Sequence, residues 1–262
     1  SMVGLIAASR AEVNGFDGVA PGAQLYILKP RTWPNGVMAT TSIMAAIDHM
    51  LDFSLRTGKR VVVNNSWGLY GCKSAALPCS VALTRAITRM DDLNAAITVW
   101  AMGNNELLGC PNGITGYCMN TIAPSVAVGA VDLSLALQPY SSRTPQCYGL
   151  QPTVVAPTEG VLPYGSRFRD FGRQGGGTSS TAPAVSGALA ILLSVYPNLS
   201  NAEARAALRG SALRLGPDPD FNPGTGSGLL RIDRALEYAP EAALDPSYAY
   251  EREFLARVST VK

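Results

Sequence analysis

The stretch "RVVVNNS", Arg60–Ser66, decides the fold class, because a run of valines leads directly into polar side chains. Two similar runs follow, "ITVWAMG" at 97–103 and "SVAVGAV" at 125–131, and segments with helical spacing separate them. Strands that are buried on both faces of a sheet have such nearly continuous apolar sequences. The pattern therefore predicts an α/β fold, a doubly wound and mostly parallel sheet with helices on both faces.

Further elements are expected on either side of these runs. Apolar residues recur at helical spacing in several segments, and a β-rich run follows the "APG" turn. The predicted segments are a strand at 23–29 and helices at 40–58, 80–96 and 199–212. Gly58 and Gly210 are predicted to end two of these helices, and Ser200 with Glu203 is predicted to form a capping box.

Composition limits the class of protein. The chain has 262 residues, of which 47% are hydrophobic and 15% charged, and this suits one large globular domain. We expect that domain at 1–236, followed by a C-terminal extension at 237–262 that is helical or partly mobile. The net charge of +2 is spread without basic clusters, so a nucleic-acid partner is not expected. The longest apolar run, "APAVSGALAILLSVYP", is too short and too interrupted for a membrane span.

The five cysteines indicate the redox environment. Cys72 with Cys79 and Cys110 with Cys118 enclose short loops, an arrangement typical of local disulfides in an exported protein. Cys147 is either a buried free thiol or the partner of a cysteine outside this chain. No Cys or His spacing suggests zinc, and one histidine cannot form a multi-histidine metal site. No metal ligand is assigned.

The stretch "GGGTSSTAPAVSG", Gly175–Gly187, contains a candidate nucleophile. Glycines lead up to Ser179, and Pro183 fits the first turn of the apolar helix that follows. In a parallel sheet, reacting groups gather where strands end and helices begin. On position alone, however, the ordinary role of such a serine is to cap a helix.

The wider sequence resembles the subtilisin-like serine peptidases, the subtilases. "GTSSTAPAVSG" is similar to the motif of their nucleophile, "VVVNNSWG" to their substrate-binding strand, and "VWAMGNNE" to the segment of their oxyanion hole. "NGFDGVAPGAQLYILK", "SVAVGAVD", "VVAPTEGV" and "GSGLLRIDRAL" follow the family's order as well. The resemblance covers about Gly4 to Leu236 and implies a subtilisin-like fold.

The resemblance also implies catalytic roles. Ser179 would attack the scissile carbonyl and form an acyl-enzyme. The Asn104 side-chain amide and the Ser179 backbone N–H would stabilise the oxyanion. Taken alone, Asn104 after Gly103 is an ordinary turn asparagine.

Substrate-binding residues are implied in the same way. An extended peptide would add as a neighbouring strand to one exposed edge. A second segment would line the opposite side of the primary substrate pocket. These residues are Ser66, Trp67, Gly68, Ala101, Met102 and Gly103. Trp67 either walls this pocket or simply packs in the core. The implied substrate is a peptide or protein.

The base for Ser179 is harder to find, because His49 is the only histidine. His49 lies in a predicted helix next to Asp48, and we interpret it as a solvated surface histidine. The resemblance places the family's His-Gly-Thr motif just before Ser1, and its aspartate, with the N-terminal part of the sheet, further upstream. The chain alone is therefore expected to be inactive.

The sequence is compatible with three interpretations of the chain. The chain is a piece of an active subtilase, one part of a nicked enzyme, or a pseudopeptidase that binds peptides along Ser66–Gly68 without catalysis. An α/β-hydrolase is excluded, because "GTSST" is not a Gly-x-Ser-x-Gly elbow and no histidine follows Ser179. The resemblance further implies a secreted or extracytoplasmic peptidase that has a propeptide or the upstream segment as partner. Structural calcium is a property of many family members.

Overall fold

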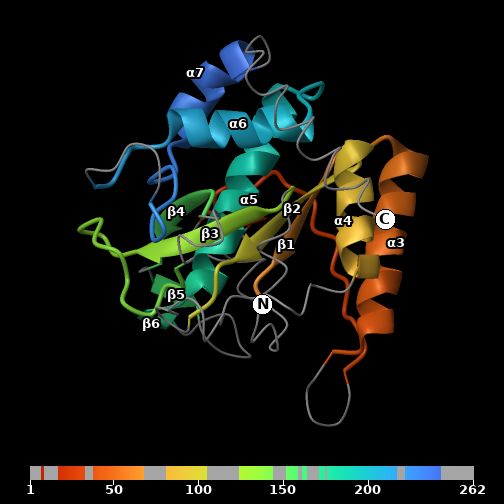
Figure 1. Ribbon diagram of the computed structural model, residues 1–262, viewed down its shortest axis with the longest axis horizontal. Helices are drawn as coiled ribbons and strands as arrows, with labels where there is room; N and C mark the ends of the chain where they lie inside the picture. The colour runs from red at the N-terminus through yellow and green to blue at the C-terminus, as the bar shows by residue number, and fades with distance from the viewer. Residues whose placement is uncertain are drawn as a thin grey trace.

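A parallel sheet of four strands lies at the centre of the computed structural model (Figure 1). The structure describes residues 7–8, 17–32, 38–67, 81–104, 124–143, 152–158, 161–163, 171–174, 176–216 and 222–242. The strands, in spatial order, are β1 (Val61–Asn65), β2 (Ala96–Ala101), β3 (Val126–Val131) and β4 (Val154–Pro157). Three of the four strands expected from the sequence are confirmed as β1, β2 and β3, and β4 completes the sheet.

Helices cover both faces of this sheet, as predicted. The helix α5 crosses one face, with α6 and α7 packed beyond it, and α3 and α4 cover the other face (Figure 1). Successive side chains of β1 point to opposite faces of the sheet. Val62 packs with α5, whereas Val61 and Val63 pack with α3 and α4. The helices are α3 (Thr40–Thr57), α4 (Val81–Asp92), α5 (Thr178–Val195), α6 (Asn201–Ser211) and α7 (Ile232–Ala242).

The parallel register brings the functional segments to one edge. Asn65 at the end of β1 lies opposite Trp100, and Ala101 at the end of β2 lies opposite Val128. A two-stranded antiparallel sheet, β5 (Val161–Pro163) with β6 (Phe171–Gln174), precedes α5 in the chain. The carboxyl ends of β1 and β2 therefore meet the start of α5.

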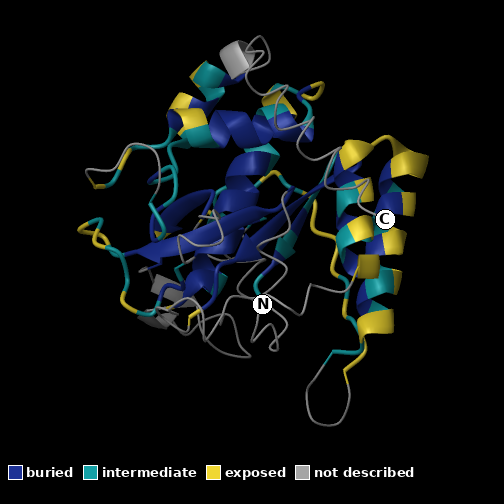
Figure 2. Ribbon diagram, viewed as in Figure 1, coloured by how far each residue is buried: buried dark blue, intermediate teal, exposed yellow. Residues whose placement is uncertain are grey.

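α5 is long and apolar enough to cross a membrane by length and composition alone. However, 67% of it is buried inside the protein, where it packs against all four strands. Figure 2 shows it in dark blue together with the sheet. Burial of this kind is that of a core helix in a globular domain, and this agrees with the prediction that the run is not a membrane span.

The predicted strand at 23–29 is not a strand in the structure. This segment is extended but has no strand partner among the described residues, and Leu25, Tyr26 and Ile27 are 49%, 59% and 79% exposed. Tyr26 instead packs on α3, where its ring lies against those of His49 and Phe53. The sequence has the composition of a strand, but a strand also needs a neighbour to pair with.

The helix ends are partly as predicted. Gly58 ends α3 in the left-handed conformation, with φ 65°, and Ser200 forms the predicted capping box with Glu203. Gly210 does not end α6, which continues to Ser211. A Cβ at Gly210 would come within 2.5 Å of the Tyr238 ring, so this glycine allows α7 to approach closely.

α4 and α5 differ in detail from the predicted segments. α4 ends at Asp92 rather than near 96, because Asn94 turns the chain with φ 50° into β2. Pro183 lies inside α5, five residues beyond its first residue, and not in the first turn. α7 runs past the expected domain boundary at 236 as far as Ala242, and residues 243–262 lie outside the described part of the chain.

A buried ion pair joins α6 to α4. Arg205 Nη1 and Nη2 lie 2.5 and 3.0 Å from the two carboxylate oxygens of Asp91, and both side chains are almost fully buried. Arg205 also donates to the carbonyl of Pro124 before β3. Since each charge lacks water, each depends on the other for its solvation.

Removing one partner of this pair should therefore be costly. We expect Asp91→Leu or Arg205→Met alone to lower the free energy of unfolding by about 3–5 kcal/mol, and the double variant to recover most of that loss. Urea unfolding followed by circular dichroism measures both quantities. Single variants as stable as the double variant would contradict this account of the pair.

Candidate active site

Ser179 is the second residue of α5 and lies at the carboxyl edge of the sheet. It is partly accessible, whereas its neighbours Thr178 and Ser180 are buried. The first N–H groups of a helix have no partner within the helix and form its positive end. Among the described residues the Ser179 N–H has no acceptor, so it remains available to a ligand oxygen.

Ser66 and Ser179 hold each other by two hydrogen bonds. The Ser66 hydroxyl donates to the Ser179 carbonyl at 2.9 Å, and the Ser179 hydroxyl donates to the Ser66 carbonyl at 3.2 Å. Pro183 explains the first bond: it stands four residues after Ser179 and has no N–H, so the helix cannot satisfy the Ser179 carbonyl. Ser66 supplies the missing donor from the end of β1.

Asn104 is fixed by the first residue of α5. Its side-chain oxygen accepts from the Thr178 N–H at 2.8 Å and from the Thr178 hydroxyl at 3.0 Å. The same hydroxyl accepts from the Gly103 N–H at 2.9 Å. Because two donors hold the amide oxygen, the amide NH₂ of Asn104 is the group left to donate. The structure thus brings Asn104 beside the start of α5, as an oxyanion hole requires.

Gly177 makes this approach possible. Its φ is +96°, a conformation that side chains rarely adopt, and a Cβ there would lie 2.8 Å from Asn104 Nδ2. Glycine is therefore required on two counts, backbone conformation and space. This is the physical reason for a glycine directly before Thr178 and the candidate nucleophile.

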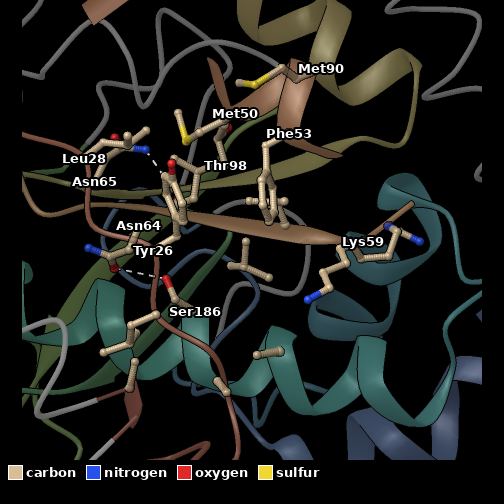
Figure 3. Close-up of a pocket in the computed structure, with 18 of the residues that line it drawn as sticks. Tyr26, Leu28, Met50, Phe53, Lys59, Asn64, Asn65, Met90, Thr98 and Ser186 are labelled. Atoms are coloured by element: carbon tan, nitrogen blue, oxygen red, sulfur yellow. Dashed lines mark hydrogen bonds between the residues drawn. The ribbon is translucent and has the colours of Figure 1, made fainter. Parts of the chain in front are cut away.

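Asn64 and Ser186 were not predicted as site residues, but they contact Ser66 and α5 by hydrogen bonds. The Asn64 amide hydrogen-bonds to the hydroxyls of Ser66 and Ser186, at 3.0 Å each. Figure 3 shows the bond to Ser186. Asn64 therefore links β1 to α5 next to Ser66. The sequence feature that could have identified Asn64 is an asparagine near the end of an apolar strand, because a polar amide in that position needs hydrogen-bond partners.

The predicted substrate-binding residues fall into three groups. Ala101, Met102 and Gly103 are buried at the carboxyl end of β2, next to Asn104. Ser66 and Trp67 follow β1, whereas Gly68 lies outside the described residues. Their roles toward a substrate stay predictions.

Trp67 packs against the core from the edge of the sheet. Its ring meets that of Trp100 edge-on, with 5.1 Å between centroids and 68° between planes. Such a pair is favourable beyond the apolar area that it buries. This direct contact favours the core-packing interpretation of Trp67.

His49 lies on the exposed side of α3, as interpreted from the sequence. Its Nε2 is 2.8 Å from the Tyr26 hydroxyl, and the two rings stack. Arg56 and Asp52 form an exposed ion pair on the same helix. Ser179 and His49 therefore have separate partners in the structure, Ser66 and Tyr26.

The cysteine and metal predictions receive no test. All five cysteines lie outside the described residues, so the disulfides stay predictions. Within the described ranges, no group of three or more His, Cys, Asp or Glu side chains could hold a metal ion. Structural calcium therefore stays a prediction.

A partly accessible serine at a helix start, with a fixed amide and a free N–H beside it, defines a serine-hydrolase type of site. The model of the "Subtilase family" matches residues 1–234, and the chain therefore belongs to this family of subtilisin-like serine peptidases. The fold and the family expected from the sequence are both confirmed.

Relatives of known name include peptidases of very different length. The chain is 28% identical to tripeptidyl-peptidase 2 of Oryza sativa subsp. japonica over 271 residues, which covers 95% of this chain and 19% of the relative. It is 29% identical to subtilisin DY of Bacillus licheniformis over 224 residues, 86% of this chain and 72% of the relative. The chain thus spans about a fifth of the tripeptidyl-peptidase sequences that it matches.

Solved structures show the same fold. The patellamide maturation protease PatA superimposes with a TM-score of 0.70 at 24% identity, covering 91% of this chain and 82% of PatA. Fervidolysin from Fervidobacterium pennivorans gives 0.69 at 24% identity, with 90% and 35% covered. At this identity the likeness concerns the fold alone.

The Ser66–Ser179 contact can be tested through Pro183. We expect Ser66→Ala to lower the free energy of unfolding by about 1–3 kcal/mol, because the Ser179 carbonyl loses its donor. In a Pro183→Ala background the new N–H can bond that carbonyl, so Ser66→Ala should cost on the order of 1 kcal/mol less.

Chemical unfolding of the four proteins of this cycle measures the coupling. Ser194→Ala, an exposed serine of the same helix, is the matched control and should change stability by less than about 0.5 kcal/mol. An equal cost of Ser66→Ala in both backgrounds would show that Pro183 does not create the need for Ser66.

Proposed function

We propose that this chain carries the nucleophile and oxyanion hole of a serine endopeptidase. The observation that supports the proposal is the joint placement of Ser179 and Asn104 at the start of α5, where Thr178 fixes the amide. Residues upstream of Ser1 supply the histidine and aspartate of the triad. The alternative is a pseudopeptidase that binds peptides along Ser66–Gly68 without catalysis.

The chemistry follows from the groups present. The Ser179 oxygen attacks the scissile carbonyl carbon, and its proton passes to the histidine base. The carbonyl oxygen becomes an oxyanion between the Asn104 NH₂ and the Ser179 N–H. The amide bond then breaks, the amine leaves with the proton from the histidine, and water later releases the acyl group from Ser179.

Without a base, Ser179 has little reason to react. Its hydroxyl donates to the Ser66 carbonyl, an acceptor that does not deprotonate it. A peptide-binding module would need the exposed edge but neither the nucleophile nor the oxyanion donor, and retention of both favours the enzyme. Residues 1–262 alone are therefore proposed to be inactive until the upstream segment joins them.

The proposal extends to other properties of the whole protein. Substrates are peptides or proteins, and a propeptide is a further partner. Secretion and two local disulfides fit the cysteine spacing. Structural calcium is proposed from the family resemblance only.

The catalytic proposal is tested by restoring the encoded residues before Ser1. We expect the extended protein to react with a fluorophosphonate probe, residues 1–262 to react only marginally, and Ser179→Ala to abolish labelling. Ser180→Ala is the matched control and should keep labelling, because Ser180 is buried. A His-Gly-Thr directly before Ser1 supports the enzyme, whereas its replacement or unchanged labelling of Ser179→Ala overturns it.

The oxyanion role of Asn104 gives a second measurement on the extended protein. Asn104→Ala should lower kcat for peptide hydrolysis by about 10²–10³-fold, with little change in KM, because the amide acts on the transition state. Asn104→Asp should not rescue the rate, since a carboxylate cannot donate to an oxyanion. A loss confined to KM would assign Asn104 to ground-state binding instead.

A further inference from the structure

Two side-chain hydroxyls bind the residue directly before α5. The Gly177 N–H donates to the Tyr140 hydroxyl at 2.9 Å, and the Tyr140 hydroxyl donates to the Thr158 hydroxyl at 3.1 Å. The Thr158 hydroxyl in turn donates to the Gly177 carbonyl at 3.0 Å. These three bonds, the hydroxyl network, begin and end on the same residue.

The direction of each bond in the hydroxyl network is fixed by its two backbone ends. The Gly177 N–H can only donate, and the Gly177 carbonyl can only accept. The Tyr140 hydroxyl is therefore the acceptor for Gly177 and the donor to Thr158, and the Thr158 proton points to the carbonyl. Removal of either hydroxyl interrupts the network, because neither side chain has a second polar group that could replace it.

The hydroxyl network ties the start of α5 to β3 and β4. Tyr140 follows β3 in the chain, and Thr158 directly follows β4. Thr158 is only 5% exposed, and its N–H donates to the carbonyl of Val131, the last residue of β3. Ser66 after β1 and Asn104 after β2 bind the same turn. The carboxyl ends of all four strands therefore hold the first residues of α5.

The peptide group between Gly177 and Thr178 connects the hydroxyl network to Asn104. Its carbonyl accepts from the Thr158 hydroxyl, and its N–H donates to Asn104 Oδ1 at 2.8 Å. Because a peptide group is planar, a rotation that broke one of these bonds would also displace the other. Thr158 and Asn104 thus bind opposite sides of one rigid unit.

Gly177 has a backbone conformation that needs this support. Its φ of 96° and ψ of 158° lie in a region that is essentially restricted to glycine. Glycine also reaches many other conformations, so the peptide groups on both sides of Gly177 are easily rotated when nothing binds them. The Ser180 N–H donates to the Gly177 carbonyl as well, at 3.0 Å, but Ser180 belongs to α5 and does not fix the peptide relative to the strands.

We propose that Tyr140 and Thr158 are positioning residues of the oxyanion hole. The hydroxyl network holds the Gly177–Thr178 peptide so that its N–H keeps the Asn104 amide in the orientation that donates to the oxyanion. The proposal rests on the proposed function, since both residues act through Asn104 in the same reaction. Their loss should therefore weaken binding of the transition state and leave binding of the substrate almost unchanged.

The kinetic test uses the extended protein that carries the encoded residues before Ser1. We expect Thr158→Val and Tyr140→Phe each to lower kcat for peptide hydrolysis by about 10–100-fold at nearly constant KM, because the donor is displaced. Thr158→Ser retains the hydroxyl and should keep most of the rate. Thr153→Val is the matched control: Thr153 lies before β4, is 3% exposed, and accepts from the Ala127 N–H, so its loss should leave kcat unchanged.

A double-variant cycle separates positioning from a general loss of structure. In an Asn104→Ala background no amide remains to be positioned, so Thr158→Val should lower kcat by less than about threefold further. An equal loss in both backgrounds would show that the hydroxyl network does not act through Asn104. That result, or a loss confined to KM, would overturn the proposal.

Hydrogen exchange on the same extended protein tests the hydroxyl network without catalysis. Thr158→Val should speed exchange of the Thr178 amide by about tenfold or more, since this N–H loses its fixed orientation, whereas Thr153→Val should not. An extended protein without any peptidase activity would refute the proposed function, yet faster exchange at Thr178 would still support the hold on the Asn104 contact. Unchanged exchange at Thr178 would overturn the positioning role even in an active enzyme.

Discussion

The packing of α5 across all four strands is the interaction on which the rest of the structure depends. α5 is buried through most of its length, and the cluster around Ala182, Val185 and Leu189 joins it to β2, β3 and β4. Because a buried helix cannot slide without opening a cavity in a close-packed core, its first turn is held in register with the strand ends. That register carries Thr178 to Asn104 and Ser179 to Ser66.

The central strands and the helices that cover them could be predicted from the sequence, because they depend on local patterns. The valines of "RVVVNNS" and the run after the serine of "SVAVGAV" are continuously apolar, a pattern typical of strands that are covered on both faces. The identity of Ser179 and Asn104 came from motif order, and burial of Ser180 agrees with the choice between the two serines. Their mutual placement through Thr178, by contrast, joins residues 74 positions apart, which no local pattern reports.

Where prediction failed, a distant partner decided the outcome. Gly210 is typical of a helix stop, yet α6 continues through it, and the Tyr238 ring packs where a side chain at 210 would lie. Residues 23–29 have the composition of a strand, yet no described strand lies beside them. Asn64 was overlooked for the same reason, since its partners Ser66 and Ser186 become neighbours only when β1 meets α5.

Two features of the described residues lie at the same edge of the sheet. β1 lacks a partner on one side, and Ser179, at the carboxyl end of the same edge, has a carbonyl rather than a base as its acceptor. A carbonyl oxygen does not take up the proton of Ser179, so the contacts of this serine hold its side chain in place but do not activate it.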